Sequence, residues 1–321
     1  MNLPGLDLDR LAAHLEGLGL TTGPLTAEMI QGGKSNLTYL VRDATRTVVV
    51  RRPPLGHVLA TAHDMAREHR VLTALQHTPV PVPRTYHLCQ DHDVIGADFF
   101  VMEYVEGGQP PVTPELTRHL TEVLAGLHAI DPATIGLGDF GRPEGFLTRQ
   151  VARWKRQLDA SRSREVKGID ELYARLAGAV PESGPAAIVH GDFKPGNTLV
   201  RDGQVVAVLD WEMSTLGDPL TDLALFLLYG DFAALDTGPA AGDPGDSREL
   251  AAHYAEVSGR DVSRLGWYVG LACFKLAVIA EGIHFRYTRG LTVGEGFADV
   301  GTNVTPLVEH GLREVDDGFR V

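Results

Sequence analysis

The stretch NTLVRDGQVVAVLD (197–210) constrains the fold more than any other part of the chain. Two apolar runs flank a central Asp-Gly, a dipeptide typical of the two-residue turn of a β-hairpin. If the chain turns there, position 201 pairs with 204, and Asn197 therefore faces Val208. Asp210 then lies two residues further along the second strand. Amide and carboxylate oxygens suit Mg²⁺ rather than Zn²⁺, so the pattern predicts that Asn197 and Asp210 bind one divalent ion together.

The segment before this hairpin reads VHGDFKPGN, in which four residues separate Asp192 from Asn197. Kinase catalytic loops have the same interval, with the aspartate facing the attacking hydroxyl and the asparagine on Mg²⁺. Asp192 is therefore predicted to be the catalytic residue. Aspartate and asparagine also serve as turn and cap residues, but the interval, the hairpin and the second carboxylate agree on a site. His190 is interpreted as a brace for the loop, with substrate contact as the alternative.

The apolar patterning divides the chain into a strand-rich first third and a helical remainder. It predicts strands at 25–31, 37–42, 47–51, 84–89 and 98–104, and helices at 8–19 and 64–75. After the break EGGQPP (106–111), it predicts helices at 114–129, 146–160, 170–179, 218–229, 248–257 and 263–289, with short strands at 186–189, 197–201 and 204–210. We therefore expect an N-lobe over residues 1–105 and a C-lobe over residues 106–321.

Charge and cysteine usage exclude some classes of function. The formal net charge is −13, which argues against a nucleic-acid binder because phosphate contacts need a basic surface. Cys89 and Cys273 lie far apart without metal-ligand spacing, so we interpret them as reduced core thiols of a cytoplasmic protein. No apolar run approaches the length of a membrane span, so no membrane association is expected.

The motifs resemble those of a known family. His190-Gly191-Asp192 with Asn197, then Asp210-Trp211-Glu212 and Gly217-Asp218-Pro219 with Asp222, resemble the signature of the aminoglycoside phosphotransferase (APH)/choline kinase family. The closer likeness is to the kinase-like domains associated with acyl-CoA dehydrogenases, in the segments VVVRRPPLG, REHRVLTAL, FFVMEYVEGG and FKLAVIAEGIHFRYTRG. The resemblance implies an α+β, bilobal protein-kinase-like fold with a small β-rich N-lobe and a larger helical C-lobe. It also implies ATP and Mg²⁺ as cofactors.

The same resemblance assigns the segment QGGKSN to the loop that covers the nucleotide. The Walker A pattern is excluded, because the first glycine of that pattern would fall at Glu28. The phosphates would meet the backbone from Gly32 to Asn36 and the Ser35 hydroxyl. Lys34 either reaches the phosphates or is solvated at the loop tip. The residues assigned to this loop are Gly32, Gly33, Ser35 and Asn36.

Arginine replaces the strand lysine by which kinases hold the nucleotide phosphates. Arg51 is the better match, with Arg52 pointing outward. Its partner follows from helical periodicity, because Glu68 lies on the apolar stripe of the helix at 64–75, and a carboxylate that faces a core must be paired. The alternative is a rotated helix with Glu68 at the surface. FFVMEYV resembles the adenine-binding hinge, so the resemblance assigns adenine contacts to Met102, Glu103, Tyr104 and Val105.

The chain is therefore expected to be an ATP-dependent kinase that phosphorylates a hydroxyl group of a small molecule. Lys275 and Arg286 are eleven residues apart on one helix and share a face, close to which Arg289 also falls, so an anionic acceptor is favoured. Structural salt bridges are the alternative. The resemblance favours a hydroxyacyl compound and a functional link to an acyl-CoA dehydrogenase. An aminoglycoside or amino-alcohol phosphotransferase and an ATP-binding pseudokinase or scaffold stay open. A protein kinase is disfavoured because Gly191 replaces the arginine of the His-Arg-Asp loop.

Overall fold

The computed structural model describes residues 3–30, 36–56, 64–232, 242–291 and 299–319 of the chain. These residues form two compact units. We call residues 1–108 and 198–214 the sheet unit, and residues 109–197 and 215–321 the helical unit. Each unit is described by itself below. The expected division of the chain between residues 105 and 106 stays a prediction.

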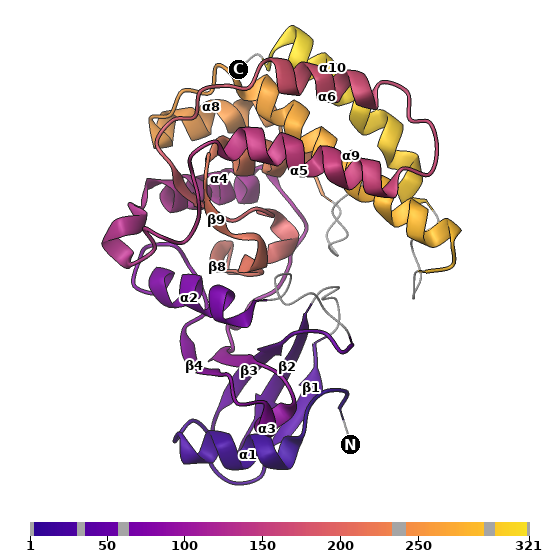
Figure 1. Ribbon diagram of the computed structural model, residues 1–321. Helices are drawn as coiled ribbons and strands as arrows, with labels where there is room; N and C mark the ends of the chain where they lie inside the picture. Colours follow the sequence, from indigo (N-terminus) through magenta and orange to yellow (C-terminus); the bar gives the residue numbers. More distant parts are fainter. Residues whose placement is uncertain (1–2, 31–35, 57–63, 233–241, 292–298, 320–321) are drawn as a thin grey trace. The chain divides into compact units, whose positions relative to one another are not determined.

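The sheet unit is built on a five-stranded antiparallel sheet in the order β1-β2-β3-β5-β4 (Figure 1). Side chains alternate between its two faces. Val48, Val50 and Arg52 of β3 point to the face covered by α1, and Arg51 points to the face covered by α2. The elements are β1 Thr26–Met29, β2 Leu37–Arg42, β3 Thr47–Arg52, β4 Thr85–Cys89, β5 Phe99–Glu103, α1 Leu8–Gly17, α2 Met65–Leu75 and α3 His92–Ile95.

Both long helices of this unit follow from the sequence. Asp7 and Asp64 cap α1 and α2 by accepting the N–H groups of Arg10 and Arg67. The predicted apolar stripe of α2 is confirmed, because Glu68 is buried together with its apolar neighbours on that face. The prediction that Arg52 points outward is wrong. Arg52 is only 5% exposed, because the N-terminal segment and α3 cover its face and their backbone carbonyl groups accept its guanidinium.

The predicted hairpin is present as β7 (Thr198–Arg201) and β8 (Gln204–Val208). Asp202 and Gly203 turn the chain with φ angles of 52° and 76°, which is the type I′ geometry that an Asp-Gly pair favours. The register differs from the prediction by one residue. A bulge between Leu199 and Val200 shifts the pairing, so that Thr198 rather than Asn197 lies opposite Val208. The 3-10 helix η3 (Trp211–Met213) follows the hairpin.

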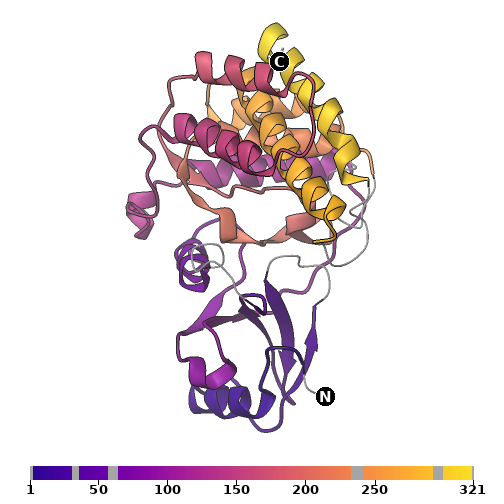
Figure 2. The same ribbon diagram turned by 45° about the vertical axis from the view of Figure 1, so that its right-hand side comes forward.

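The helical unit packs its helices around α9, with α10 alongside it in both views (Figures 1 and 2). The helix α10 was absent from the sequence-based prediction, as was the short strand β9, which pairs with β6. A glycine permits the close approach of α10, because a Cβ at Gly311 would lie 2.9 Å from the Cβ of Cys273. The α-helices are α4 Pro114–Ala129, α5 Phe146–Ser161, α6 Ile169–Gly178, α7 Leu220–Asp231, α8 Ser247–Ser258, α9 Leu265–Thr288 and α10 Val304–Asp317. The other elements are β6 Ala187–Val189, β9 Thr215–Gly217, η1 Pro132–Ile135, η2 Pro195–Asn197 and η5 Val300–Asn303.

Helix α9 is long and apolar enough to cross a membrane by length and composition, which corrects the expectation that no run approaches a span. Its most apolar 18-residue window has a mean hydropathy of 1.4, but 72% of that window is buried within the protein. The core helix of a soluble protein passes the same test. A helix packed on several sides has no need of a polar face, which accounts for the apolar sequence.

Candidate active site

A buried ion-pair network lies at the end of the hairpin in the sheet unit. The Arg51 guanidinium donates from Nε to Glu68 Oε2 at 3.0 Å and from a terminal nitrogen to Asp210 Oδ1 at 2.5 Å. The predicted Arg51–Glu68 pair is therefore confirmed, and Arg51 rather than Arg52 faces α2. Burial raises the pKa of Glu68, and the Arg51 guanidinium opposes this effect. The network fixes the β3 arginine, the α2 glutamate and the carboxylate that follows the hairpin.

Asp210 itself has a backbone conformation that few non-glycine residues adopt. Its φ and ψ angles are 65° and 59°, in the left-handed region, and its side chain is 30% exposed. Aspartate tolerates this region better than most residues, although at a cost in free energy. Such outliers gather at functional sites, where the surrounding structure holds them in place. Here the hydrogen bond from Arg51 to the Asp210 carboxylate helps to hold the residue in this conformation.

The predicted nucleotide-contacting residues lie only partly within the described residues. Gly32, Gly33, Lys34 and Ser35 fall outside them. Asn36 is described and 4% exposed, and its amide donates to Glu212 Oε2 at 2.9 Å. The end of the loop segment is therefore tied to η3, immediately after Asp210.

The predicted adenine-binding segment forms the end of β5 and the residues after it. Met102 is buried, and the Glu103 N–H group donates to the Arg84 carbonyl oxygen at 2.8 Å. Tyr104 is exposed and Val105 is half-buried. Because the Glu103 N–H is engaged within the sheet, the backbone of Tyr104 and Val105 is the better candidate for hydrogen bonds to a purine. The adenine role of this segment stays a prediction.

In the helical unit, the carboxylate of Asp192 is held from both sides. The Tyr229 hydroxyl donates to Oδ1 at 2.7 Å, and the Asn197 amide donates to Oδ2 at 3.1 Å. Lys194 Nζ lies 3.4 Å from Oδ2. Burial would raise the pKa of Asp192, but the charges of Lys194 and Lys275 outweigh it and hold the pKa below its ordinary value. Asp192 is thus an ionised and oriented carboxylate at neutral pH.

The backbone of the predicted catalytic loop is fixed by the buried carboxylate of Asp222. Asp222 Oδ2 accepts the N–H of His190 at 2.5 Å, and Asp222 Oδ1 accepts the N–H of Gly191 at 2.8 Å. The ring nitrogen Nδ1 of His190 in turn accepts the N–H of Asp192 at 3.2 Å. This confirms the interpretation of His190 as a brace. On the other side of the loop, Lys275 of α9 donates to the Gly191 carbonyl oxygen at 2.8 Å.

Asp222 makes a testable contribution to stability. Burial would raise its pKa, but His128, His190 and the N–H of Gly191 outweigh this and lower the pKa. A carboxyl group whose folded-state pKa is depressed stabilises the fold above its unfolded pKa of about 3.9, and loses this effect as pH falls through the folded-state pKa. Asp222→Asn should reduce the free energy of unfolding at pH 7 by about 1–3 kcal/mol, because one N–H donor loses its acceptor.

The measurement is urea unfolding of the wild type and of Asp222→Asn at several pH values. The difference between the two proteins should be largest near neutral pH and should shrink below about pH 4. Asp159→Asn is a control, because Asp159 is an exposed carboxylate that pairs with Lys155. A difference that stays constant down to acid pH would contradict the ionised state of Asp222.

The proposed acceptor residues occupy two different environments on α9. Lys275 is partly buried and bonded to the Gly191 carbonyl oxygen, whereas Arg286 and Arg289 are exposed near the C-terminal end of the helix. The guanidinium of Arg289 lies 4.2 Å from the centre of the Phe285 ring. No ion pair joins Arg286 or Arg289 to a carboxylate of the described residues. Cations at this end also complement the helix dipole.

Two neighbours of Asp192, Lys194 and Tyr229, are not among the site residues predicted from the sequence. Lys194 lies within the motif, two residues after Asp192, so its position was a usable signal. Tyr229 lies near the end of the apolar helix α7, where nothing in the local pattern distinguishes it from a core residue. Its contact with Asp192 joins positions 37 residues apart.

The joint binding of a metal by Asn197 and Asp210 stays a prediction, because these residues belong to different units.

The family model described as the phosphotransferase enzyme family (APH) matches residues 26–264. This match spans both the ion-pair network around Arg51 and the loop that carries Asp192. The chain belongs to this family. Its fold is the protein-kinase-like fold of the family, with a β-sheet part and a helical part, as the sequence predicted.

Two solved structures and one curated relative illustrate the match. A protein of Ralstonia eutropha, provisionally named an aminoglycoside phosphotransferase, is 30% identical, with a TM-score of 0.85 over 98% of this chain and 99% of that one. A thermostable mutant of the aminoglycoside phosphotransferase APH(4)-Ia, in a ternary complex with AMP-PNP and hygromycin B, is 16% identical, with a TM-score of 0.65 over 96% of this chain and 99% of that one.

The curated relative is acyl-CoA dehydrogenase family member 11 of Rattus norvegicus, which is 34% identical over 331 residues. The alignment covers 94% of this chain but only 42% of that protein. The chain therefore spans about two fifths of the length of this relative. The predicted likeness to kinase-like domains associated with acyl-CoA dehydrogenases is confirmed.

Proposed function

We propose that the chain is an ATP- and Mg²⁺-dependent kinase that transfers the γ-phosphoryl group to a hydroxyl group of a small molecule. The observation that carries the proposal is the ionised carboxylate of Asp192, oriented by Tyr229 and Asn197 on a braced loop. Phosphoryl transfer needs an oriented hydroxyl more than a strong base, because its transition state is loose. A fixed carboxylate with a low pKa fits that requirement.

The nucleotide part of the proposal rests on the sheet unit. In this assignment, Arg51 binds the α- and β-phosphates while Glu68 holds its guanidinium in place, as the lysine–glutamate pair does in protein kinases. Guanidinium has donors for both a carboxylate and a phosphate. We also assign Gly32, Gly33, Ser35 and Asn36 to phosphate binding, and the segment from Met102 to Val105 to adenine binding. The complex of APH(4)-Ia with AMP-PNP supports nucleotide use within this fold.

The donor set fits a bound Mg²⁺ ion. Asp210 offers a carboxylate held in a left-handed backbone conformation, and Asn197 directs its amide nitrogen to Asp192, which leaves its carbonyl oxygen as the ligand. Joint binding of one ion by these two residues is part of the proposal. When bound, the ion would neutralise charge on the phosphate oxygens. Both ligands are hard oxygen donors, as Mg²⁺ requires.

In the reaction itself, the Asp192 carboxylate accepts the hydrogen bond of the acceptor hydroxyl. Oδ1 has a second lone pair for this bond, beyond the one that the Tyr229 hydroxyl engages, whereas Oδ2 already faces both Asn197 and Lys194. As the new oxygen–phosphorus bond forms and the bond to the β-phosphate oxygen breaks, the hydroxyl proton passes to Asp192. ADP and the phosphorylated acceptor are the products.

For the acceptor we propose a hydroxyacyl compound, either a free acid or a thioester. Two observations support an anionic acyl acceptor: the relatives named acyl-CoA dehydrogenases, and the exposed cations Arg286 and Arg289 on α9. The proposal includes a functional link to an acyl-CoA dehydrogenase. An aminoglycoside or amino alcohol is the second candidate, favoured by the name of the Ralstonia protein and by the net charge of −13.

We also propose a cytoplasmic location for the chain, where ATP is available. Cys89 and Cys273 are both free and buried, as expected for a reducing compartment.

An ATP-consumption screen with hydroxyacyl acids and thioesters, choline-type alcohols and aminoglycosides tests this proposal. The expected result is Mg²⁺-dependent ADP release with one of the acyl classes, together with a phosphorylated product detected by mass spectrometry. Turnover of an aminoglycoside or amino alcohol would establish the second candidate instead. Absence of ADP release with every acceptor, while the protein binds MgATP, would favour a pseudokinase or scaffold.

Arg286→Glu then tests the anionic acceptor directly. Charge reversal should raise the KM for the acyl acceptor about tenfold or more, because the new carboxylate repels an anionic acceptor. The KM for ATP should be nearly unchanged, because salt screens the effect of an exposed charge on more distant ligands. Arg118→Glu, which reverses the charge of an exposed arginine on helix α4, is a matched control. A loss of thermal stability in the absence of any ligand, with no change in the acceptor KM, would instead indicate a structural role for Arg286.

A further inference from the structure

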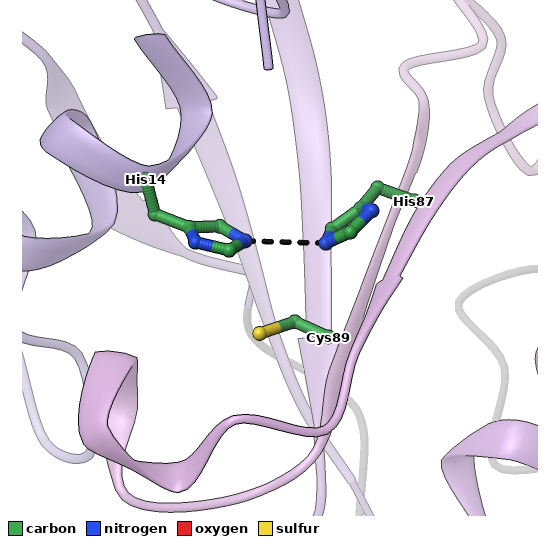
Figure 3. A group of neighbouring side chains, drawn as sticks. All are labelled: His14, His87 and Cys89. Carbon is green, nitrogen blue, oxygen red and sulfur yellow. Dashed lines mark hydrogen bonds between the residues drawn. The ribbon is translucent and has the colours of Figure 1, made fainter. Parts of the chain in front are cut away.

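Three potential metal ligands meet in the sheet unit, on the face of the sheet opposite Arg51 and Glu68. His14 lies on α1, and His87 and Cys89 lie on β4, more than 70 residues further along the chain. Their ligand atoms all lie within 4.8 Å of one another. Figure 3 shows the two imidazole rings facing each other, with the Cys89 side chain beside them. No metal-ligand spacing in the sequence predicts this cluster, because α1 and β4 are distant along the chain.

The spacing within the cluster is close to that of a tetrahedral site. The Nε2 atoms of His14 and His87 lie 3.1 Å apart. Two imidazole nitrogens on one tetrahedral Zn²⁺, with bonds of about 2.0–2.1 Å, are separated by about 3.3 Å. A nitrogen and a thiolate sulfur on the same ion would be about 3.6 Å apart. A cation therefore fits among the three side chains with shifts of tenths of an ångström to about one ångström.

The protonation states suit a metal as well. A hydrogen bond between two Nε2 atoms uses one N–H and one lone pair, whereas an ion in place of that proton engages both lone pairs. The Cys89 thiol donates weakly to the Asp91 carbonyl oxygen, with the sulfur 3.7 Å from that oxygen, and it becomes a metal ligand by releasing its proton.

We propose that His14, His87 and Cys89 bind one Zn²⁺ ion, or a cation of similar softness, with water as the fourth ligand. Imidazole and thiolate select such ions, whereas the oxygen ligands Asn197 and Asp210 select Mg²⁺. Cys89 is 3% exposed, and the two histidines are only partly buried, so a solvent molecule can complete the coordination. The ion joins α1 to β4, the edge strand of the sheet, and so stabilises the sheet unit.

The test uses the untagged full chain, reduced and freed of metal with a chelator. Zn²⁺ titration against a competing chromogenic chelator should give one site per chain, and Zn²⁺ should raise the midpoint of thermal unfolding. Co²⁺ should give the intense visible d–d bands of tetrahedral coordination together with a sulfur-to-cobalt charge-transfer band. His14→Gln, His87→Gln and Cys89→Ser should each weaken Zn²⁺ binding by at least about tenfold, because even the loss of a residue that only hydrogen-bonds to a ligand costs about that much.

Two controls separate this site from adventitious binding. His92→Gln removes an exposed histidine of the same unit that pairs with Asp98, and Cys273→Ala removes the other buried thiol. Both should bind Zn²⁺ as the wild type does. Equal affinity in the three ligand variants, or absence of a one-to-one site at micromolar Zn²⁺, would overturn the proposal. If a ligand variant fails to fold, the wild-type Co²⁺ spectrum decides, because lack of a charge-transfer band excludes the thiolate.

Discussion

Asp192→Asn is expected to lower kcat by about 10²–10⁴-fold, because general-base catalysis usually contributes a rate factor of that size. The asparagine keeps the shape of the side chain and one oxygen acceptor, so the contact with Asn197 can persist. Its amide can donate to the Tyr229 hydroxyl oxygen, which reverses that hydrogen bond without breaking it. The loop should therefore stay folded, and the loss should reflect the missing charge rather than a disordered site.

The measurement is kcat for Asp192→Asn with the acceptor identified by the screen, beside an ATP titration of the same protein. ATP affinity should be unchanged or slightly tighter, because a negative charge near the γ-phosphate has gone. Asp159→Asn, which removes an exposed carboxylate of α5 that pairs with Lys155, is the control for charge alone. Turnover near that of the wild type would exclude the proposed role and would favour the scaffold alternative.

Asp210→Asn is expected to abolish most of the stabilisation that MgATP gives to the protein, and to lower kcat at least about 10²-fold. A metal ion contributes several kcal/mol to the stabilisation of transferring charge, and each 1.36 kcal/mol corresponds to a factor of ten. Asparagine is preferred to alanine here, because it tolerates the left-handed backbone that Asp210 adopts. Arg51 keeps its bond to Glu68, so the network loses one partner and not both.

Thermal unfolding with and without MgATP measures the first effect, and kcat against Mg²⁺ concentration measures the second. Asp202→Asn is a closely matched control, because Asp202 is the other non-glycine residue with a positive φ among the described residues and lies at the turn of the hairpin that precedes Asp210. An Asp210→Asn protein that MgATP stabilises as strongly as the wild type would show that the metal assignment is wrong.

The sequence by itself determined the elements and pairings that depend on local pattern. The Asp-Gly turn positioned the hairpin of β7 and β8, because few dipeptides adopt two successive positive φ angles. Helical periodicity placed Glu68 on the buried stripe of α2, and the cost of an unpaired buried charge identified Arg51 as its partner. The motif around Asp192 identified the family, because its residues lie close together in the chain.

Tertiary structure alone decided the contacts between elements that are distant in sequence. The bulge that moved Thr198 opposite Val208 and the burial of Arg52 both depend on what packs against each strand. Tyr229 meets Asp192 only because α7 passes beside the loop, and the local pattern of α7 is that of any apolar helix. His14 meets His87 and Cys89 for the same reason. Side chains from separate elements come together through packing, and the periodicity of one element shows which of its faces is buried but not which other element packs against that face.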